Sequence, residues 1–278
     1  MTKTWLITGA SAGLGRLMTE ALLARGDTVI ATVRRQTALD DLGERHPETL
    51  RVMVLDVTDA AAVRRVVVQA FAEAGRIDIV VSNAGYGLFG AAEELTDAQI
   101  ERQVATNLLG SIGVIRASLP HLRSQGGGRI LQVSSEGGQT TYPNFSVYHA
   151  TKWGIEGFVE AVAQEVAPFG IDFVIVEPGP TATSFGSNID GAEPMPAYDA
   201  TPSGDIRRAL ASGSFVLTGD AGRSVAAMIA AGDADEPPLR LALTSTAYAN
   251  IERSLRSRLS ALEAQKAIAF SADRDAKA

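Results

Sequence analysis

The sequence contains no cysteine and very little lysine. None of its 278 residues is Cys, and Lys occurs only at positions 3, 152, 266 and 277. The absence of cysteine excludes disulfide bonds, a thiolate metal site and a cysteine nucleophile, and it fits a reducing cytoplasm. His46, His121 and His149 share no metal-ligand spacing, so we expect no metal site and place all three on the surface.

Positive charge and long apolar runs are also scarce. The net charge is −7, from 25 Lys and Arg against 32 Asp and Glu, and no dense basic run occurs, so we expect no nucleic-acid partner. No apolar run approaches the ~18 residues of a membrane span. The first ten residues lack a signal-peptide pattern. We therefore expect a cytoplasmic protein that binds neither nucleic acid nor a membrane.

Short apolar runs alternate with longer helical patterns. Strands are predicted over 4–8, 28–33, 51–55, 77–82, 129–134 and 171–176, and helices over about 13–25, 59–75, 96–119 and 148–168. Repeated strand–helix units of this kind predict an α/β fold, a Rossmann-type doubly wound parallel sheet with helices on both faces. Since no linker interrupts the pattern, we expect a single domain over 1–278.

Several segments depart from this pattern. Pro120 and the run 126–128 interrupt the helical pattern that precedes them. Residues 184–218, rich in Pro and Gly, predict a lid-like substrate loop inserted before the C-terminal helices. Apolar residues at 251, 255, 259 and 262 predict a helix whose stripe packs in the core or in a subunit interface. Residues 270–278 read as a polar tail.

A glycine-rich turn joins the first predicted strand to the first predicted helix. Glycine allows a tight turn and close approach of a phosphate, and the following helix N-terminus offers free N–H groups. The alternative is an ordinary turn. The candidate cofactor-binding residues here are Gly9, Ser11, Gly13, Leu14 and Gly15.

The end of the second predicted strand indicates which nicotinamide cofactor would bind. A free ribose 2′-hydroxyl usually meets Asp or Glu at this point, whereas this chain has Arg34 and Arg35. A guanidinium suits a 2′-phosphate, so Arg34 favours NADP(H) over NAD(H), the alternative being a solvated basic pair. After the third strand, Asp56 and Val57 are candidates for contact with adenine, although Asp56 could equally cap the next helix.

Small and hydroxyl-bearing residues follow two further strands. Where the fourth and sixth predicted strands end, such residues let the backbone approach a ligand lying across the strand ends. Turns without a ligand are the alternative reading. The candidate cofactor-binding residues there are Asn83, Ala84, Gly85, Pro178, Gly179, Thr181 and Thr183.

Tyr148 and Lys152 lie four residues apart on a predicted helix and therefore share one face. A nearby ammonium favours the phenolate, so Lys152 is expected to lower the pKa of Tyr148 and make it a proton donor and acceptor for a carbonyl/alcohol pair. The serines at 134 and 135 end the fifth strand and offer a hydroxyl to a substrate oxygen.

Other polar residues near these positions carry less information. Asn107, a poor helix-interior residue, indicates a local role such as holding a water or kinking the helix. Glu136 could touch substrate, but we expect it to be solvated in a loop. Arg207 and Arg208 are expected to form a solvated face.

Taken in order and spacing, these motifs resemble the short-chain dehydrogenase/reductase family from about residue 4 to 183. The resemblance rests on the glycine turn, the Asn-Ala-Gly element, Asn107, a Ser thirteen residues before Tyr148, the Tyr-x-x-x-Lys motif and the Pro-Gly element with a later Thr. It selects Ser135 rather than Ser134 as the catalytic serine and aligns Arg34 with the basic position of NADP-preferring members. Those members often carry a basic residue in the glycine turn, where this chain has Ala12.

The resemblance implies an NADP(H)-dependent oxidoreductase acting on a small carbonyl or alcohol. Ser135 and Tyr148 would bind the carbonyl oxygen, Tyr148 would donate the proton, Lys152 would bind the nicotinamide ribose, and Asn107 would hold a water in a proton relay. The family also implies a homodimer or homotetramer through the helices at 96–122 and 148–168. Two other functions are weighed against this: a non-catalytic NADP(H)-binding module, and an epimerase or dehydratase.

Overall fold

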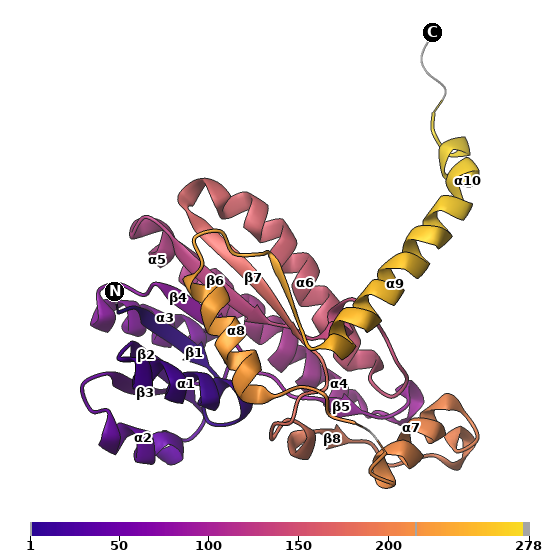
Figure 1. Ribbon diagram of the computed structural model, residues 1–278, viewed down its shortest axis with the longest axis horizontal. Coiled ribbons are helices and arrows are strands. Elements are labelled where there is room, and N and C mark those ends of the chain that lie inside the picture. The colour runs from indigo at the N-terminus through magenta and orange to yellow at the C-terminus, as the bar shows by residue number, and fades with distance from the viewer. Residues whose placement is uncertain (1, 215, 275–278) are drawn as a thin grey trace.

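The computed structural model describes residues 2–214 and 216–274 and is built on a parallel sheet of seven strands (Figure 1). The strand order is β3-β2-β1-β4-β6-β7-β9. The predicted doubly wound sheet is confirmed, but the sequence predicted six of these strands and missed the last. The strands are β1 Thr4–Thr8, β2 Thr28–Val33, β3 Leu50–Val54, β4 Ile79–Ser82, β6 Gly128–Val133, β7 Ile171–Pro178 and β9 Arg240–Leu243.

Helices cover both faces of this sheet because its strands are apolar on both sides. In β1, Trp5 and Ile7 join the core beneath α1 (Gly13–Arg25), α2 (Asp40–Arg45) and α8 (Ala221–Asp233). Leu6, between them, joins the core beneath the helices of the other face. Those helices are α3 Ala60–Ala74, α5 Ser111–Ser124 and α6 Ser146–Val166, with α4 Asp97–Val104 preceding α5.

The strand order reverses between β1 and β4. The chain runs outward from β1 through β2 to β3, and then returns to add β4 on the other side of β1. In open parallel sheets, ligands bind outside the carboxyl ends of the strands at such a switch point. The predicted site residues after β1, β4, β6 and β7 all lie at this edge.

Pro120 does not end its helix. α5 continues through Pro120 to Ser124 and is followed by Gly126, Gly127 and Gly128, all with positive φ. Pro120 and the residue four before it are both exposed, so water can bind the carbonyl group that loses its helical donor. The irregularity lies earlier, in a π-helical turn over Ala105–Gly110 between α4 and α5.

The segment at 184–218, expected to be a loop, contains a short strand and a helix, and Phe215 within it lies outside the described residues. β8 (Asp190–Gly191) pairs with β5 (Leu88–Phe89), and α7 spans Pro202–Ala211 with Thr201 as its N-cap. Proline at the first helical position supports this start, because its missing N–H has no partner there in any helix. The prolines therefore begin a helix rather than exclude one.

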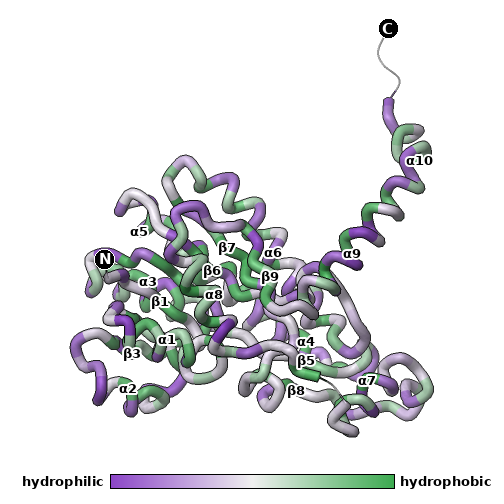
Figure 2. Tube along the Cα trace, viewed as in Figure 1, coloured by the Kyte–Doolittle hydropathy of each residue, from purple (hydrophilic) through white to green (hydrophobic). Residues whose placement is uncertain are grey.

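The C-terminal helices α9 (Ser245–Ala264) and α10 (Lys266–Ser271) project from the body of the fold (Figures 1 and 2). Ile251 is buried, but Leu255, Leu259 and Leu262 are 48%, 56% and 60% exposed. The expected stripe is therefore not core within this chain, and its role in a subunit interface stays a prediction. α10 takes in the start of the expected polar tail, and residues 275–278 lie outside the described part.

Within residues 2–214 and 216–274, no helix combines the length and the apolar character needed to cross a bilayer.

We predict that Arg129 stabilises the fold by capping α8. Its Nη1 lies 2.7–3.0 Å from the carbonyl oxygens of Ala231, Gly232 and Ala234 at the end of that helix. Because buried charged hydrogen bonds are lost, Arg129→Met should lower the free energy of unfolding by about 2 kcal/mol or more in a urea titration. Arg256→Met, which removes only an exposed pair with Glu252, should cost less than about 0.5 kcal/mol. Equal effects would contradict the capping role.

Candidate active site

The glycine turn after β1 is packed against the loop that follows β4. Gly9 has φ +66°, and an added Cβ there would lie 2.8 Å from the Ala84 Cα. An added Cβ at Gly15 would lie 2.5 Å from Asn83 Nδ2. Glycine is thus required at both positions for the two strand ends to meet. α1 then begins at Gly13, with no side-chain cap and no acidic residue in its first turn, which leaves its N-terminal amides available to an anion.

Asn83 and Thr8 join the two loops at the switch point. Asn83 Nδ2 donates to the carbonyl oxygen of Thr8 at 2.9 Å and to that of Gly9 at 3.2 Å. The Thr8 hydroxyl accepts from the backbone N–H groups of Asn83 and Ala84. The Asn-Ala-Gly element therefore fixes the glycine turn, and its side-chain amide is engaged by the protein rather than left for a ligand.

The candidates for the adenosine end lie at the ends of β2 and β3. Arg34 is exposed and forms no hydrogen bond or ion pair with the described residues, so its guanidinium is available to a ligand. Asp56 Oδ1 accepts from the N–H and hydroxyl of Thr58 at 2.9 and 2.8 Å. Asp59, not Asp56, caps α3 by accepting from the amides of Ala61 and Ala62. The alternative capping role of Asp56 is therefore wrong.

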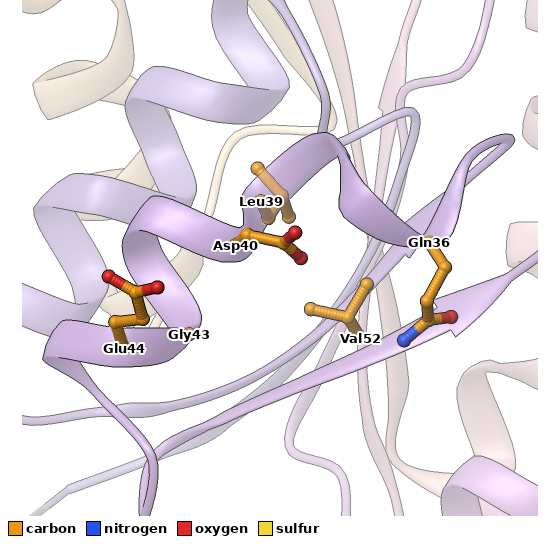
Figure 3. A pocket seen from close by; sticks show the side chains of 6 residues that line it. All are labelled: Gln36, Leu39, Asp40, Gly43, Glu44 and Val52. Atoms are coloured by element: carbon orange, nitrogen blue, oxygen red, sulfur yellow. The ribbon is translucent and has the colours of Figure 1, made fainter.

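An open depression of about 450 Å³ lies beyond Arg34, between α2 and β3 (Figure 3). None of the predicted site residues lines it. Asp40 and Glu44 do, and two carboxylates make it unsuitable for a phosphate. The phosphate site expected at Arg34 is therefore separate from this depression. Its lining residues are Gln36, Leu39, Asp40, Gly43, Glu44 and Val52.

The segment after β7 returns to the start of α1. An added Cβ at Gly13 would lie 3.7 Å from Ser184 Oγ and 4.0 Å from Thr183 Cβ. Thr183 Oγ1 accepts from the N–H of Phe185, and Thr181 Oγ1 donates to the Gly179 carbonyl. The end of the Pro178–Thr183 segment thus lies against the glycine turn.

α6 carries a stripe of functional side chains against the end of β6. Lys152 Nζ donates to the Val133 carbonyl at 3.0 Å and lies 5.6 Å from the centre of the Tyr148 ring. The next residue on that face, Glu156, accepts from the Ser134 hydroxyl at 2.5 Å. Ser135 Oγ accepts from Gly137 N–H, and the Ser135 hydroxyl lowers the pKa of Tyr148. Tyr148, Lys152 and Ser135 are each less than 8% exposed.

Burial dominates the acidity of this pair. It raises the pKa of Tyr148 to about 12, while the Ser135 hydroxyl lowers it and Glu136 raises it. It lowers the pKa of Lys152 to about 8, against the opposing effect of Glu156. The expected lowering of the Tyr148 pKa is therefore wrong for the protein without ligands, because desolvation of the phenolate outweighs the effect of the Ser135 hydroxyl.

Asn107 lies in the π-helical turn and holds the loop after β4. Its Nδ2 donates to the Tyr86 carbonyl at 2.8 Å, and its Oδ1 accepts from the Tyr86 N–H at 3.1 Å. The expected local role is thus a backbone clamp, made possible because the π turn disrupts the regular helix at this residue.

Aromatic rings and the segment at 184–218 cover Tyr148. The Phe185 ring lies 5.9 Å from the Tyr148 ring, and Phe145 lies 5.9 Å from it on another side. Buried Glu94 anchors this covering segment by accepting from the Met195 N–H and pairing with Arg207 at 2.7 Å. Arg207 is therefore largely buried, in contrast to its expected solvation, whereas Arg208 is exposed.

Comparison with known proteins places this arrangement in a family. A family model described as short chain dehydrogenase matches residues 3–194. The chain belongs to the short-chain dehydrogenase family. It is 39% identical to the oxidoreductase BOA17 of Botryotinia fuckeliana, over 87% of this chain and 88% of that protein.

Solved structures of the same fold agree with this assignment. A short-chain dehydrogenase from Streptomyces avermitilis superposes with a TM-score of 0.91 at 39% identity, covering 99% of this chain and 100% of that one. An alcohol dehydrogenase from Thermococcus sibiricus, solved in complex with 5-hydroxy-NADP, gives a TM-score of 0.71 at 25% identity, covering 87% and 96%.

Two residues of this short-chain dehydrogenase are buried where solvation was expected. His149 packs its ring beside Tyr142 and its Nδ1 lies 2.9 Å from the Gly137 carbonyl. Glu136 lies beneath α9, where Asn250 Nδ2 donates to it at 3.0 Å. Burial lowers the pKa of His149 and raises that of Glu136. Sequence reasoning could not foresee that the turn at 136–138 folds inward.

Sequence reasoning also missed an ionic cluster beneath the site. Arg240 on β9 pairs with Glu156 at 2.6 Å, with Glu160 at 2.8 Å and with Glu177. Gln139 donates to Glu177 at 2.7 Å, and burial raises the pKa of Glu177 to about 7. The one available signal was Glu156, which follows Lys152 by four residues on the same helix face.

We predict that Gly138 is required for this arrangement. An added Cβ would lie 1.8 Å from Glu156 Oε1, so Gly138→Ala must displace the carboxylate from Ser134. The free energy of unfolding of the Gly138→Ala variant, measured in a urea titration, should be lower by about 1–3 kcal/mol. Gly157 lies on α6, next to Glu156, and has open space around it. Gly157→Ala should therefore leave the free energy of unfolding unchanged or raise it by up to ~1 kcal/mol. A neutral Gly138→Ala variant would refute the requirement.

Proposed function

We propose that this short-chain dehydrogenase is an NADP(H)-dependent oxidoreductase that interconverts a ketone or aldehyde with an alcohol. The observation that supports this most is the α6 stripe, where Tyr148 and Lys152 face Ser135 at the end of β6. These groups can bind a carbonyl oxygen and deliver a proton to it.

The residues present fit a nicotinamide dinucleotide. The uncapped start of α1 suits the pyrophosphate, and the exposed Arg34 guanidinium suits a 2′-phosphate. Asp56 and Val57 would face the adenine end, and Thr183, which lies beside Gly13, would face the other end together with Thr181. The bound cofactor supplies the hydride, and the protein supplies binding, orientation and the proton.

The chain's own residues then handle the proton. Ser135 and Tyr148 hydrogen-bond the substrate oxygen, and Tyr148 is the general acid in reduction and the general base in oxidation. A phenol with a pKa of about 12 is protonated at neutral pH and therefore carries the proton that reduction requires. Lys152, when protonated, stabilises the phenolate that forms, while Asn107 fixes the loop beside the pair.

The surroundings of Tyr148 favour an apolar or aromatic carbonyl substrate. Phe145, Phe185 and Tyr142 place rings around the site. Apolar walls with few polar groups are typical of small-molecule pockets. We further propose that one domain carries the whole site, and that the enzyme is cytoplasmic and assembles as a homodimer or homotetramer through α4, α5 and α6.

We predict a preference for NADPH that depends on Arg34. In fluorescence titrations, NADPH should bind at least about tenfold more tightly than NADH, because a charged hydrogen bond contributes about 1.5–3 kcal/mol. Arg34→Ala should erase this difference while leaving NADH binding unchanged. Arg253→Ala, on the distant α9, should retain it. Equal binding of both cofactors by the unchanged protein would show that the cofactor is not selected at Arg34.

We predict that Tyr148→Phe abolishes turnover but not cofactor binding. Loss of a positioned general acid should lower kcat about 10²–10⁴-fold in NADPH-dependent reduction of a panel of aryl and alkyl ketones and aldehydes. Tyr248→Phe, at an exposed position on α9, should retain full activity. NADPH binding without any turnover in the unchanged protein would indicate the non-catalytic binding module instead.

A further inference from the structure

The carboxylate of Glu156 lies at the centre of the contacts that join α6 to the strand ends. Its Oε1 accepts from the Ser134 hydroxyl at 2.5 Å, and its Oε2 accepts from Arg240 Nη1 at 2.6 Å. Burial raises the pKa of this carboxyl, and the donors on both of its oxygens oppose that effect by favouring the ionised form. The residue is 2% exposed, so this charge acts on its neighbours with little screening by water.

Glu156 and Lys152 engage successive residues at the end of β6. Lys152 Nζ donates to the Val133 carbonyl, and Glu156 accepts from the side chain of the next residue, Ser134. The residue after that is Ser135. Two adjacent turns of α6 thus fix the strand end that presents the serine hydroxyl, and the negative charge lies one helical turn from the lysine amine.

We propose that Glu156 is a positioning residue, whose carboxylate keeps Lys152 in its charged form and holds the strand end that carries Ser135. The link to catalysis rests on the function proposed above. Neither Ser134 nor Arg240 can replace this effect on Lys152, because one is neutral and the other positive. The carboxylate also explains how a lysine so deeply buried keeps a pKa near 8, since Glu156 opposes the effect of desolvation.

Glu160 provides a matched control. It lies one turn further along α6 and pairs with the same arginine, through Nη2 at 2.8 Å and Nε at 3.1 Å. Its side chain is 47% exposed, however, and it makes no contact with the end of β6 among the described residues. Loss of its charge therefore disturbs Arg240 without removing the buried charge beside Lys152.

Two other buried carboxylates, those of Glu136 and Glu177, lie in this region. Glu136 lies on the turn after β6 and has the Asn250 amide as its partner, and Glu177 lies on β7 with Gln139 and Arg240 as partners. Neither accepts a hydrogen bond from Ser134, and neither is on the α6 face. The groups facing this region are Tyr148 and Glu156 on α6, Glu136 after β6, Glu177 on β7 and Arg240 on β9.

The small number of lysines makes the charge of Lys152 directly measurable. A full-length protein labelled with [¹³Cε]lysine gives only four lysine signals, and Lys152→Arg identifies one of them. Its midpoint in a pH titration should be near 8 in the unchanged protein. Glu156→Gln should lower the Lys152 midpoint by about one pH unit, because removal of a nearby opposite charge shifts a pKa by about 1–3 units. Glu160→Gln should leave it within about 0.3 unit, since exposed charges are screened.

Three further readouts complete the test. In Glu156→Asp, which retains the charge, the pH midpoint of Lys152 should return most of the way to its value in the unchanged protein. This variant also tests the proposal if Glu156→Gln does not fold. In NADPH-dependent reduction of acetophenone, the fall of kcat/KM at high pH should move down with the Lys152 midpoint in Glu156→Gln and not in Glu160→Gln. NADPH titration in the same variants reports the cofactor site separately.

The outcomes separate the two proposals. An unchanged Lys152 midpoint in Glu156→Gln, or equal shifts in both variants, would overturn the role of Glu156 whatever the enzyme does. A shifted midpoint together with absent NADPH binding in the unchanged protein would support the effect of Glu156 on Lys152 and overturn the proposed function.

Discussion

The contact between α6 and the carboxyl end of β6 is the interaction on which the site depends. Residues 148, 152 and 156 follow one another at helical spacing, and they face Ser135, the Val133 carbonyl and the Ser134 hydroxyl. A rotation of α6 by one residue would remove all of these contacts together. The turn at 137–138 must also be glycine, since an added Cβ would meet His149 at one position and Glu156 at the other.

The topology of the sheet provides the second constraint, because it brings the glycine turn next to this contact. The turn after β1 meets the loop after β4 only where the strand order reverses. Thr8 and Asn83 join these loops, since the side chain of each forms a hydrogen bond with the backbone of the other. β6 then lies beside β4, so Ser135 is placed two strands from the glycine turn. The glycine turn and the group of Tyr148, Lys152 and Ser135 are thus arranged by strand order rather than by any single side chain.

The sequence was sufficient for the features that depend on local spacing. The first two strands and the shared face of Tyr148 and Lys152 were predicted and are confirmed. What it did not reveal depends on distant partners. β9 has only four residues, with no long alternation to identify it, and Arg240 meets Glu156 across 84 positions of the chain. The burial of Glu136 and His149 likewise depends on α9 and on an inward turn, which no local pattern indicates.

The ionic cluster is costly for stability, and this bears on why it is present. Taking charges out of water costs several kcal/mol per ion, and well-packed apolar groups of similar size often stabilise a protein equally or better. A purely structural contact between α6 and β9 could therefore use apolar side chains. The cluster instead contains two deeply buried carboxylates. That of Glu156 lies on α6, the helix that carries Lys152, and that of Glu177 lies directly before Pro178. A buried amine at Lys152 requires a compensating negative charge close by. The need for a charged lysine at the site therefore accounts for Glu156, and the need to satisfy Glu156 in turn accounts for Arg240.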